Sequence, residues 1–149
     1  AGILAMIAVP SFRQFMLNQR LKNASYDVVS ALALTRSEAI TRNSTVSLVA
    51  SGGDWANGWC VTTAMDCSAA AIVQHAALNR GISVSTYLLG TTTAGPTTIT
   101  FGSSGRMNSA ATVFAIASAT AVSGVQTRCV TLSLAGTSHI SVVDTGSCS

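Results

Sequence analysis

The side chains that could do chemistry are few and scattered along this chain. It has two histidines, His75 and His139, together with five Asp and Glu residues and four cysteines. Neither histidine has a neighbour at metal-ligand spacing, and no Cys-x-x-Cys pair is present. A GxSxG elbow, an HExxH helix and a P-loop are all absent, and the glycine-rich turn at 102–105 has no lysine after it. The sequence therefore predicts no catalytic residue, no metal site and no cofactor, and we expect a protein that is not an enzyme.

The remaining polar and aromatic candidates have ordinary structural interpretations. We expect His75 in the core or on a sheet face and His139 in a solvent-facing hairpin. Asp54, Asp66 and Asp144 fall at turn positions, where Asp commonly accepts a hydrogen bond from nearby backbone. Glu38 should form an intrahelical pair with Arg42 or Arg36. Trp55 and Trp59, in the segment DWANGW, are expected to anchor a turn to the core rather than to form a ligand platform.

The cysteines indicate disulfides and therefore a compartment outside the cytosol. Four cysteines allow three pairings. We favour Cys60–Cys67 and Cys129–Cys148, because each pair is close in sequence and would close a loop. By the chain-entropy relation the two closures contribute about 2.5 and 3.3 kcal/mol.

Charge is sparse and excludes several classes of protein. Charged residues make up 9% of the 149 residues and the net charge is +3, whereas Ser and Thr together number 38. A charged disordered tail, a coiled coil or a DNA-packaging protein would need a much higher charge density. Beyond residue 80 the cations are Arg106 and Arg128, which are the possible but weak DNA contacts in this half of the chain.

The chain opens in an apolar run, residues 1–9, that is uncharged up to residue 12. Nine residues are too few to cross a bilayer, which needs about 20. We expect this run to be part of a longer hydrophobic helix that begins before Ala1. The helical pattern continues through Pro10, where a proline is expected to bend the helix. One kinked helix of about 60 Å is therefore predicted over residues 1–42.

The two halves of this helix need different surroundings. Residues 17–43 carry one apolar stripe and end at Asn43, a suitable left-handed cap. Residues 1–16 are apolar almost all round, so a single domain face cannot bury them. They need lipid or other copies of the same helix, which is typical of a protein that is inserted or assembled.

From residue 44 the apolar period changes from helical to alternating. Short β-branched runs bounded by Gly, Ser, Asn or Pro predict strands. The expected strands are 46–50, 58–62, 71–76, 82–88, 98–101, 112–117, 127–134 and 138–143, the last two forming a hairpin. The fold class is therefore α+β, with the helix packed on an antiparallel sheet or two small sheets, and residues 44–149 form one globular domain.

Four segments carry a resemblance to a known family. AGILAMIAVPSFRQFM at the start of the chain closely resembles the assembly helix of type IV pilins and type II secretion pseudopilins. LTRSEAITRNSTVSL (34–48), DWANGWCV (54–61) and ITFGSSGRM (99–107) resemble the hallmark segments of the GspH/FimT family of minor pilins and pseudopilins. The resemblance implies processing by a prepilin peptidase, methylation of a Phe and a Glu near the new N-terminus, all ahead of Ala1.

The resemblance also implies a fold and a function. The family fold is a kinked helix packed on a two-sheet β domain. Its members are structural subunits held in the inner membrane with a periplasmic domain, and they assemble with other subunits into an extracellular pilus or a periplasmic pseudopilus. A minor pilin that primes or caps the filament is expected; a secretion pseudopilin, a major subunit and a DNA-uptake pilin are the alternatives. The implied assembly residues are Ile3, Leu4, Met6, Ile7, Val9, Pro10 and Phe12.

DNA uptake is the least favoured of these functions. Members of the FimT type carry a GRxR motif in the last hairpin. The corresponding turn here reads Gly136-Thr137-Ser138-His139, so both arginines are missing. With only Arg106 and Arg128 nearby in sequence, few phosphates would be neutralised, and DNA is an unlikely partner.

Overall fold

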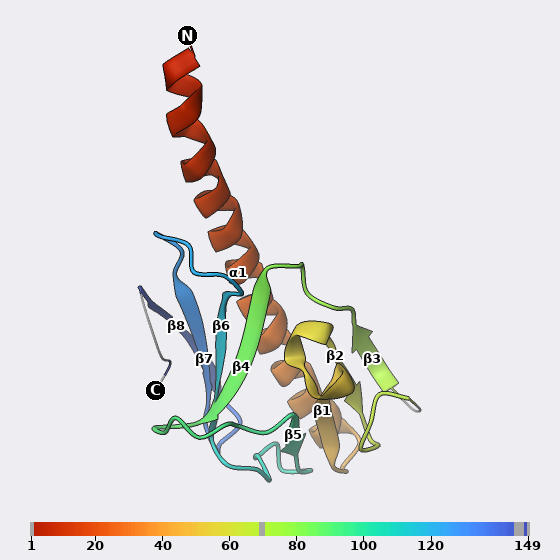
Figure 1. Ribbon diagram of the computed structural model, residues 1–149. Helices are drawn as coiled ribbons and strands as arrows, with labels where there is room; N and C mark the ends of the chain where they lie inside the picture. Colours follow the sequence, from red (N-terminus) through yellow and green to blue (C-terminus); the bar gives the residue numbers. More distant parts are fainter. Residues whose placement is uncertain (1, 69–70, 145–147, 149) are drawn as a thin grey trace.

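One long helix, α1 (Gly2–Thr41), opens the chain and carries the β domain at its C-terminal end. The computed structural model describes residues 2–68, 71–144 and 148, with side chains in α1 from residue 11 onward. Figure 1 shows the N-terminal part of α1, in red, projecting well beyond the strands. The helix is continuous through Pro10, so the expected length is confirmed and the bend at Pro10 stays a prediction.

The buried face of α1 follows the apolar stripe in the sequence. Leu21, Val28 and Leu32 are each at most 2% exposed, because they face the two sheets. Phe12 and Phe15, before this stripe, are 63% and 57% exposed. The β domain therefore covers the second part of the helix and leaves the aromatic side chains of the first part uncovered.

The end of α1 is closed by a capping motif. Asn43 has a φ of 48°, the left-handed conformation expected of it. The Ser44 amide donates to the Ala39 carbonyl and the Asn43 amide to the Ile40 carbonyl, both at 3.1 Å. This is the Schellman pattern, which satisfies carbonyls left over at the helix end. The expected Glu38–Arg42 ion pair is also present, at 2.7 Å.

The described part of the chain forms two four-stranded antiparallel sheets, with orders β3-β2-β1-β5 and β4-β6-β7-β8. The strands match the predicted runs to within two residues, and the α+β class is confirmed. Their bounds are β1 (Val46–Ala50), β2 (Trp59–Thr62), β3 (Ala71–His75), β4 (Ile82–Leu88), β5 (Thr98–Phe101), β6 (Thr112–Ser118), β7 (Thr127–Leu132) and β8 (Ser138–Val143). The predicted strand 127–134 stops at Leu132, since Ser133 and Thr137 close the hairpin turn through backbone and hydroxyl hydrogen bonds.

The two sheets and α1 share one hydrophobic core. Trp55, in the short 3-10 helix η2 (Trp55–Asn57), meets Phe114 of β6 edge to face with ring centroids 5.0 Å apart. Its indole N–H donates to the Pro96 carbonyl at 3.3 Å. Trp55 and Trp59 are 3% and 2% exposed, which confirms that both tryptophans are core anchors.

Both expected disulfides are present. Cys60–Cys67 ties β2 to the loop that follows it, across a sequence separation of 7. Cys129–Cys148 ties β7 to the C-terminal segment, across a separation of 19. Cys129 and Cys148 are buried beside Val113, so this bridge also fills a small apolar cluster on the outer side of the second sheet.

Candidate functional site

The chemistry-bearing side chains do not come together in the fold. Across residues 2–68, 71–144 and 148, no group of three or more His, Cys, Asp or Glu side chains could hold a metal ion. His75 lies in β3 and His139 in β8, so the two histidines belong to different sheets. His139 is exposed, as expected for a hairpin position.

The aspartates at turns serve local structure. Asp54 accepts from the Ala56 amide at 2.8 Å and caps η2, and Asp66 accepts from the Ser68 amide at 2.9 Å. These two bonds confirm the sequence interpretation. Asp144 differs, because its carboxylate accepts from the Gln126 side-chain amide at 2.6 Å and thereby joins the start of β7 to the end of β8.

His75 has a structural environment on the face of the first sheet. Its ring stacks on Trp59 with centroids 4.2 Å apart, and its Nε2 lies 3.7 Å from the Asp27 carboxylate of α1. The Nδ1 atom is 2.7 Å from the Ala76 carbonyl. This arrangement connects edge strand β3 to the helix, and it confirms the expected sheet-face position.

Arg106 and Arg128 do not form one patch. Arg106 lies in the β5–β6 loop, and the amide of its neighbour Met107 donates to the Leu134 carbonyl beyond the far end of β7. Arg128 is the second residue of β7. β7 continues for four more residues to Leu132, which corresponds to about 13 Å, and Leu134 lies beyond that end. The two candidate DNA contacts therefore lie toward opposite ends of the second sheet.

The projecting part of α1 is the largest feature that the domain leaves uncovered. Phe12, Phe15 and Met16 are exposed on it. The other expected assembly residues lie outside the described side chains, although their backbone is helical: Ile3, Leu4, Met6, Ile7, Val9 and Pro10. Over the described residues, no helix combines the length and the hydropathy of a membrane span.

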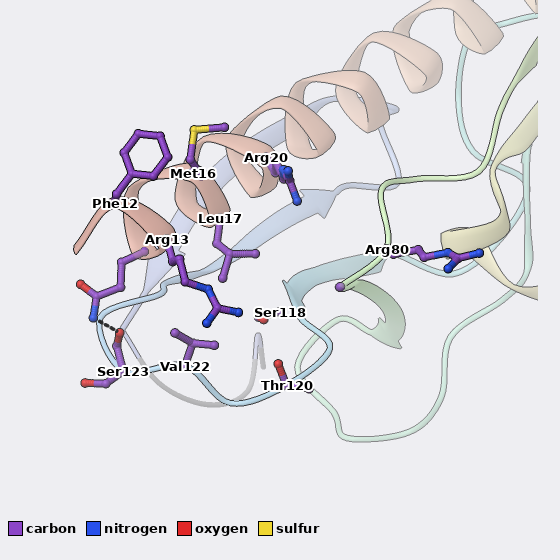
Figure 2. Close-up of a pocket in the computed structure, with 12 residues that line it drawn as sticks. Phe12, Arg13, Met16, Leu17, Arg20, Arg80, Ser118, Thr120, Val122 and Ser123 are labelled. Carbon is purple, nitrogen blue, oxygen red and sulfur yellow. Dashed lines mark hydrogen bonds between the residues drawn. The ribbon is translucent and has the colours of Figure 1, made fainter. Parts of the chain in front are cut away.

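A groove of about 690 Å³ lies where this projecting part meets the β domain. One wall is α1, with Arg13, Leu17 and Arg20, and the other is the end of β6 at Ser118 and the β6–β7 loop as far as Ser123. Figure 2 shows the Arg13 side chain extending from the helix toward Thr120 and Val122 of that loop. Arg80 also lines the groove, and in Figure 2 its side chain extends away from Arg13. The groove lining includes three arginines and no carboxylate.

Polar side chains of α1 hold the β6–β7 loop in place. Gln14 donates to the Ser123 carbonyl at 2.6 Å, and Asn18 donates to the Gly124 carbonyl at 3.0 Å. The Asn18 side-chain oxygen also accepts from the Gln126 amide at 3.0 Å. Sequence reasoning missed this groove, because only the spacing of Arg13 and Arg20 on one helix face is visible without the tertiary fold.

A second helix–turn contact surrounds Arg36. Its guanidinium donates to the Gly136 carbonyl at 3.5 Å, and its Nε is buried without a hydrogen-bond partner among the described residues. A Cβ on Gly105 would lie 2.7 Å from the Ile40 Cδ1 atom. The family-like segments 34–48 and 99–107 thus meet here, together with the turn of the last hairpin.

A long projecting helix packed on two antiparallel sheets is the architecture of a pilin-type subunit. In the described residues no group of metal-ligating side chains accompanies it. The family "Type II transport protein GspH" matches residues 24–136, most of the chain. The chain therefore belongs to the GspH family, as its four segments indicated. No match was found among curated proteins.

Solved structures with the same fold include two kinds of subunit. The type IV minor pilin FimU of Pseudomonas aeruginosa superposes with a TM-score of 0.68 at 21% identity, over 85% of this chain and 92% of that chain. The minor pseudopilin EpsH of the Vibrio cholerae type 2 secretion system gives 0.60 at 14% identity, over 81% and 95%. At these sequence identities, both similarities show that the fold is shared and nothing further.

Proposed function

We propose that this chain is a non-enzymatic minor subunit of a type IV pilus or of a type II secretion pseudopilus. Its projecting helix packs among the helices of other subunits, and its β domain lies on the outside of the filament. It is held at the inner membrane before assembly and carries its domain on the periplasmic side. Priming or capping of the filament is the role that we assign to it.

The observation that carries this proposal is the uncovered apolar part of α1. Phe12 and Phe15 are more than half exposed although their own domain begins to bury the helix only a few residues later. From residue 2 to residue 9 the apolar run continues the same helix away from the domain. A helix that is apolar almost all round requires an apolar environment, and parallel helices of neighbouring subunits supply one. Head-to-tail contacts of this kind do not close, and they build filaments.

The alternative of a secretion pseudopilin is supported by the family description and by the likeness to EpsH. The same helix packing serves both assemblies, so the two alternatives share one mechanism. They differ in where the filament is found, which makes the location of assembled material the decisive readout.

The proposal is tested by placing a charge in the apolar run. Ile7→Lys should reduce incorporation into sheared filaments at least tenfold, because a charge among packed apolar helices is expensive. Quantitative mass spectrometry of the filaments and of the membrane fraction measures both incorporation and expression. Wild-type chain at trace level relative to the main subunit supports a minor pilin, and absence from surface filaments with presence in the periplasmic fraction supports a pseudopilin.

The matched control is Thr92→Lys, which adds the same charge to an exposed position of the β4–β5 loop. It should assemble like the wild type. Normal incorporation of Ile7→Lys would contradict packing through this helix, and stoichiometric abundance of the wild type would contradict a minor role.

A further inference from the structure

The basic groove between α1 and the β6–β7 loop is not explained by helix packing alone. Arg13, Arg20 and Arg80 have no ion pair or hydrogen bond in the part of the chain that the structure describes. They are three of the eight cations of a chain that is otherwise poor in charge. The Arg80 side chain extends away from Arg13 (Figure 2), so Arg13 and Arg20 carry the positive potential of this groove, whose lining has no carboxylate, and such a potential favours an anion.

The two helix arginines face the same groove by their spacing. Positions 13 and 20 differ by seven residues, so they lie within about 20° of each other around the helix and about 10 Å apart along it. Lys22 is nine residues from Arg13, which places it about 180° away, on the opposite side of α1. The charge beside the groove is thus built by specific positions and is not a property of the whole helix surface.

The groove is preformed on its other wall. The three hydrogen bonds that Gln14 and Asn18 make fix the β6–β7 loop against the helix without using the arginines. Ser118, at the end of β6, and Thr120 of the loop also line the groove. Hydroxyls beside guanidinium groups suit a phosphate oxygen, which accepts hydrogen bonds from both.

The position of the groove along α1 indicates the source of that phosphate. Arg13 lies four residues beyond the end of the apolar run, about 6 Å along the helix. The headgroup layer on each side of a bilayer is about 5–8 Å thick, so an apolar run ending at the hydrocarbon boundary places Arg13 at headgroup depth. Arg20, about 16 Å beyond the run, then lies on the aqueous side of that layer. Phe12, on the membrane side of Arg13, is 63% exposed and gives an apolar surface for the adjoining acyl chain.

A second copy of this chain is a poor alternative occupant, because its carboxylates are already engaged. Glu38 pairs with Arg42 and Asp27 lies beside His75. The side chains of Asp54, Asp66 and Asp144 each accept hydrogen bonds within the chain. Only Glu38 is neutralised by a cation, but the other carboxylates are single charges that form no acidic cluster in the described residues, so a neighbouring copy offers no acidic patch to the groove.

We propose that this groove binds the headgroup of an anionic phospholipid at the membrane surface before the subunit is assembled. The proposal rests on the proposed function, since it needs the apolar run to lie in lipid. The headgroup phosphate lies beside Arg13, with Arg20 on its aqueous side, and the Thr120 hydroxyl donates to one of its free oxygens. Binding there fixes the height and the rotation of the subunit in the membrane, so that α1 and the domain are presented to the growing filament in one orientation.

The test uses the full chain in zwitterionic detergent, with short-chain phosphatidylglycerol added and bound lipid counted by native mass spectrometry. We expect one phosphatidylglycerol to be retained in preference to phosphatidylcholine, which has a phosphate but no net charge. Arg20→Gln should weaken retention at least fivefold, and Arg13→Gln/Arg20→Gln should abolish the preference. Thermal unfolding should be unchanged, because neither side chain supports the fold.

Lys22→Gln is the matched control, since it removes the same charge two residues away on the other side of the helix. It should retain phosphatidylglycerol like the wild type. An equal loss in Lys22→Gln and Arg20→Gln would show diffuse surface attraction and overturn the proposal. Equal retention of the two lipids, or displacement of the lipid by millimolar inorganic phosphate, would overturn it as well.

A photo-crosslinking residue in place of Thr120 tests the occupant in cells. Adducts with phospholipid in the membrane fraction support the proposal, and adducts formed only with another filament subunit overturn it. Filament incorporation is measured in the same cells. If the wild-type chain binds no lipid but is incorporated into filaments normally, the lipid proposal fails and the proposed function stands. If the wild-type chain does not reach filaments at all, the proposed function itself is contradicted.

Discussion

At the scale of single residues, Gly136 is a position where the backbone needs glycine. Its φ is 79°, and a Cβ there would lie 2.5 Å from the Gly105 carbonyl and 3.1 Å from the Phe101 ring. Gly136→Ala should therefore lower the free energy of unfolding by about 2–4 kcal/mol, from the left-handed conformation and the overlap together. Denaturant unfolding of the oxidised protein measures the change.

Gly90 is the control that isolates the loss of stability due to the left-handed backbone conformation alone. Its φ is 75°, but a Cβ there would meet nothing within 4 Å. Gly90→Ala should cost only about 1 kcal/mol. If both variants lost the same free energy of unfolding, the close approach of the two turns beside Arg36 would add nothing to the cost of the Gly136 substitution.

Residue roles could be predicted from sequence where the chemistry is local. Cysteines close in sequence indicated both disulfides, and Asn43 was identifiable as a cap because it follows the last helical turn. The contact of Arg36 with Gly136 spans 100 residues. No local pattern encodes such a contact, because it depends on how the helix lies across the sheets.

At the scale of elements, α1 and the β6–β7 loop act as one unit through Asn18. Asn18→Ala removes two hydrogen bonds, one to the Gly124 carbonyl and one from the Gln126 amide. Hydrogen exchange of the Gln126 amide should accelerate at least tenfold while the strand amides keep their protection, because only local opening is affected. Asn23→Ala, at an exposed position of the same helix, should leave exchange unchanged. Faster exchange throughout the second sheet would contradict a local role.

The elements themselves followed from apolar periodicity, but their partition into two sheets did not. β1 and β5 pair across 47 residues of intervening chain, and β4 pairs with β6 rather than with a sequence neighbour. Periodicity indicates which face of a strand is buried, but it does not identify the strand with which it pairs. The groove depends on this partition, since the β6–β7 loop reaches α1 only after the second sheet has formed.

At the scale of the whole molecule, the low charge noted in the sequence is unevenly distributed, and this argues against a DNA receptor. Arg106 and Arg128 lie toward opposite ends of the second sheet, so together they would neutralise about two phosphates. The part of any log–log salt slope for duplex binding that Arg106 and Arg128 supply should therefore be no larger than about 2. Fluorescence anisotropy with a labelled 20-base-pair duplex over a salt series measures the slope. The double variant Arg106→Gln/Arg128→Gln should change the salt slope little. A wild-type slope near −6 that this double variant flattens would make DNA binding, instead of filament packing, the function of the β domain.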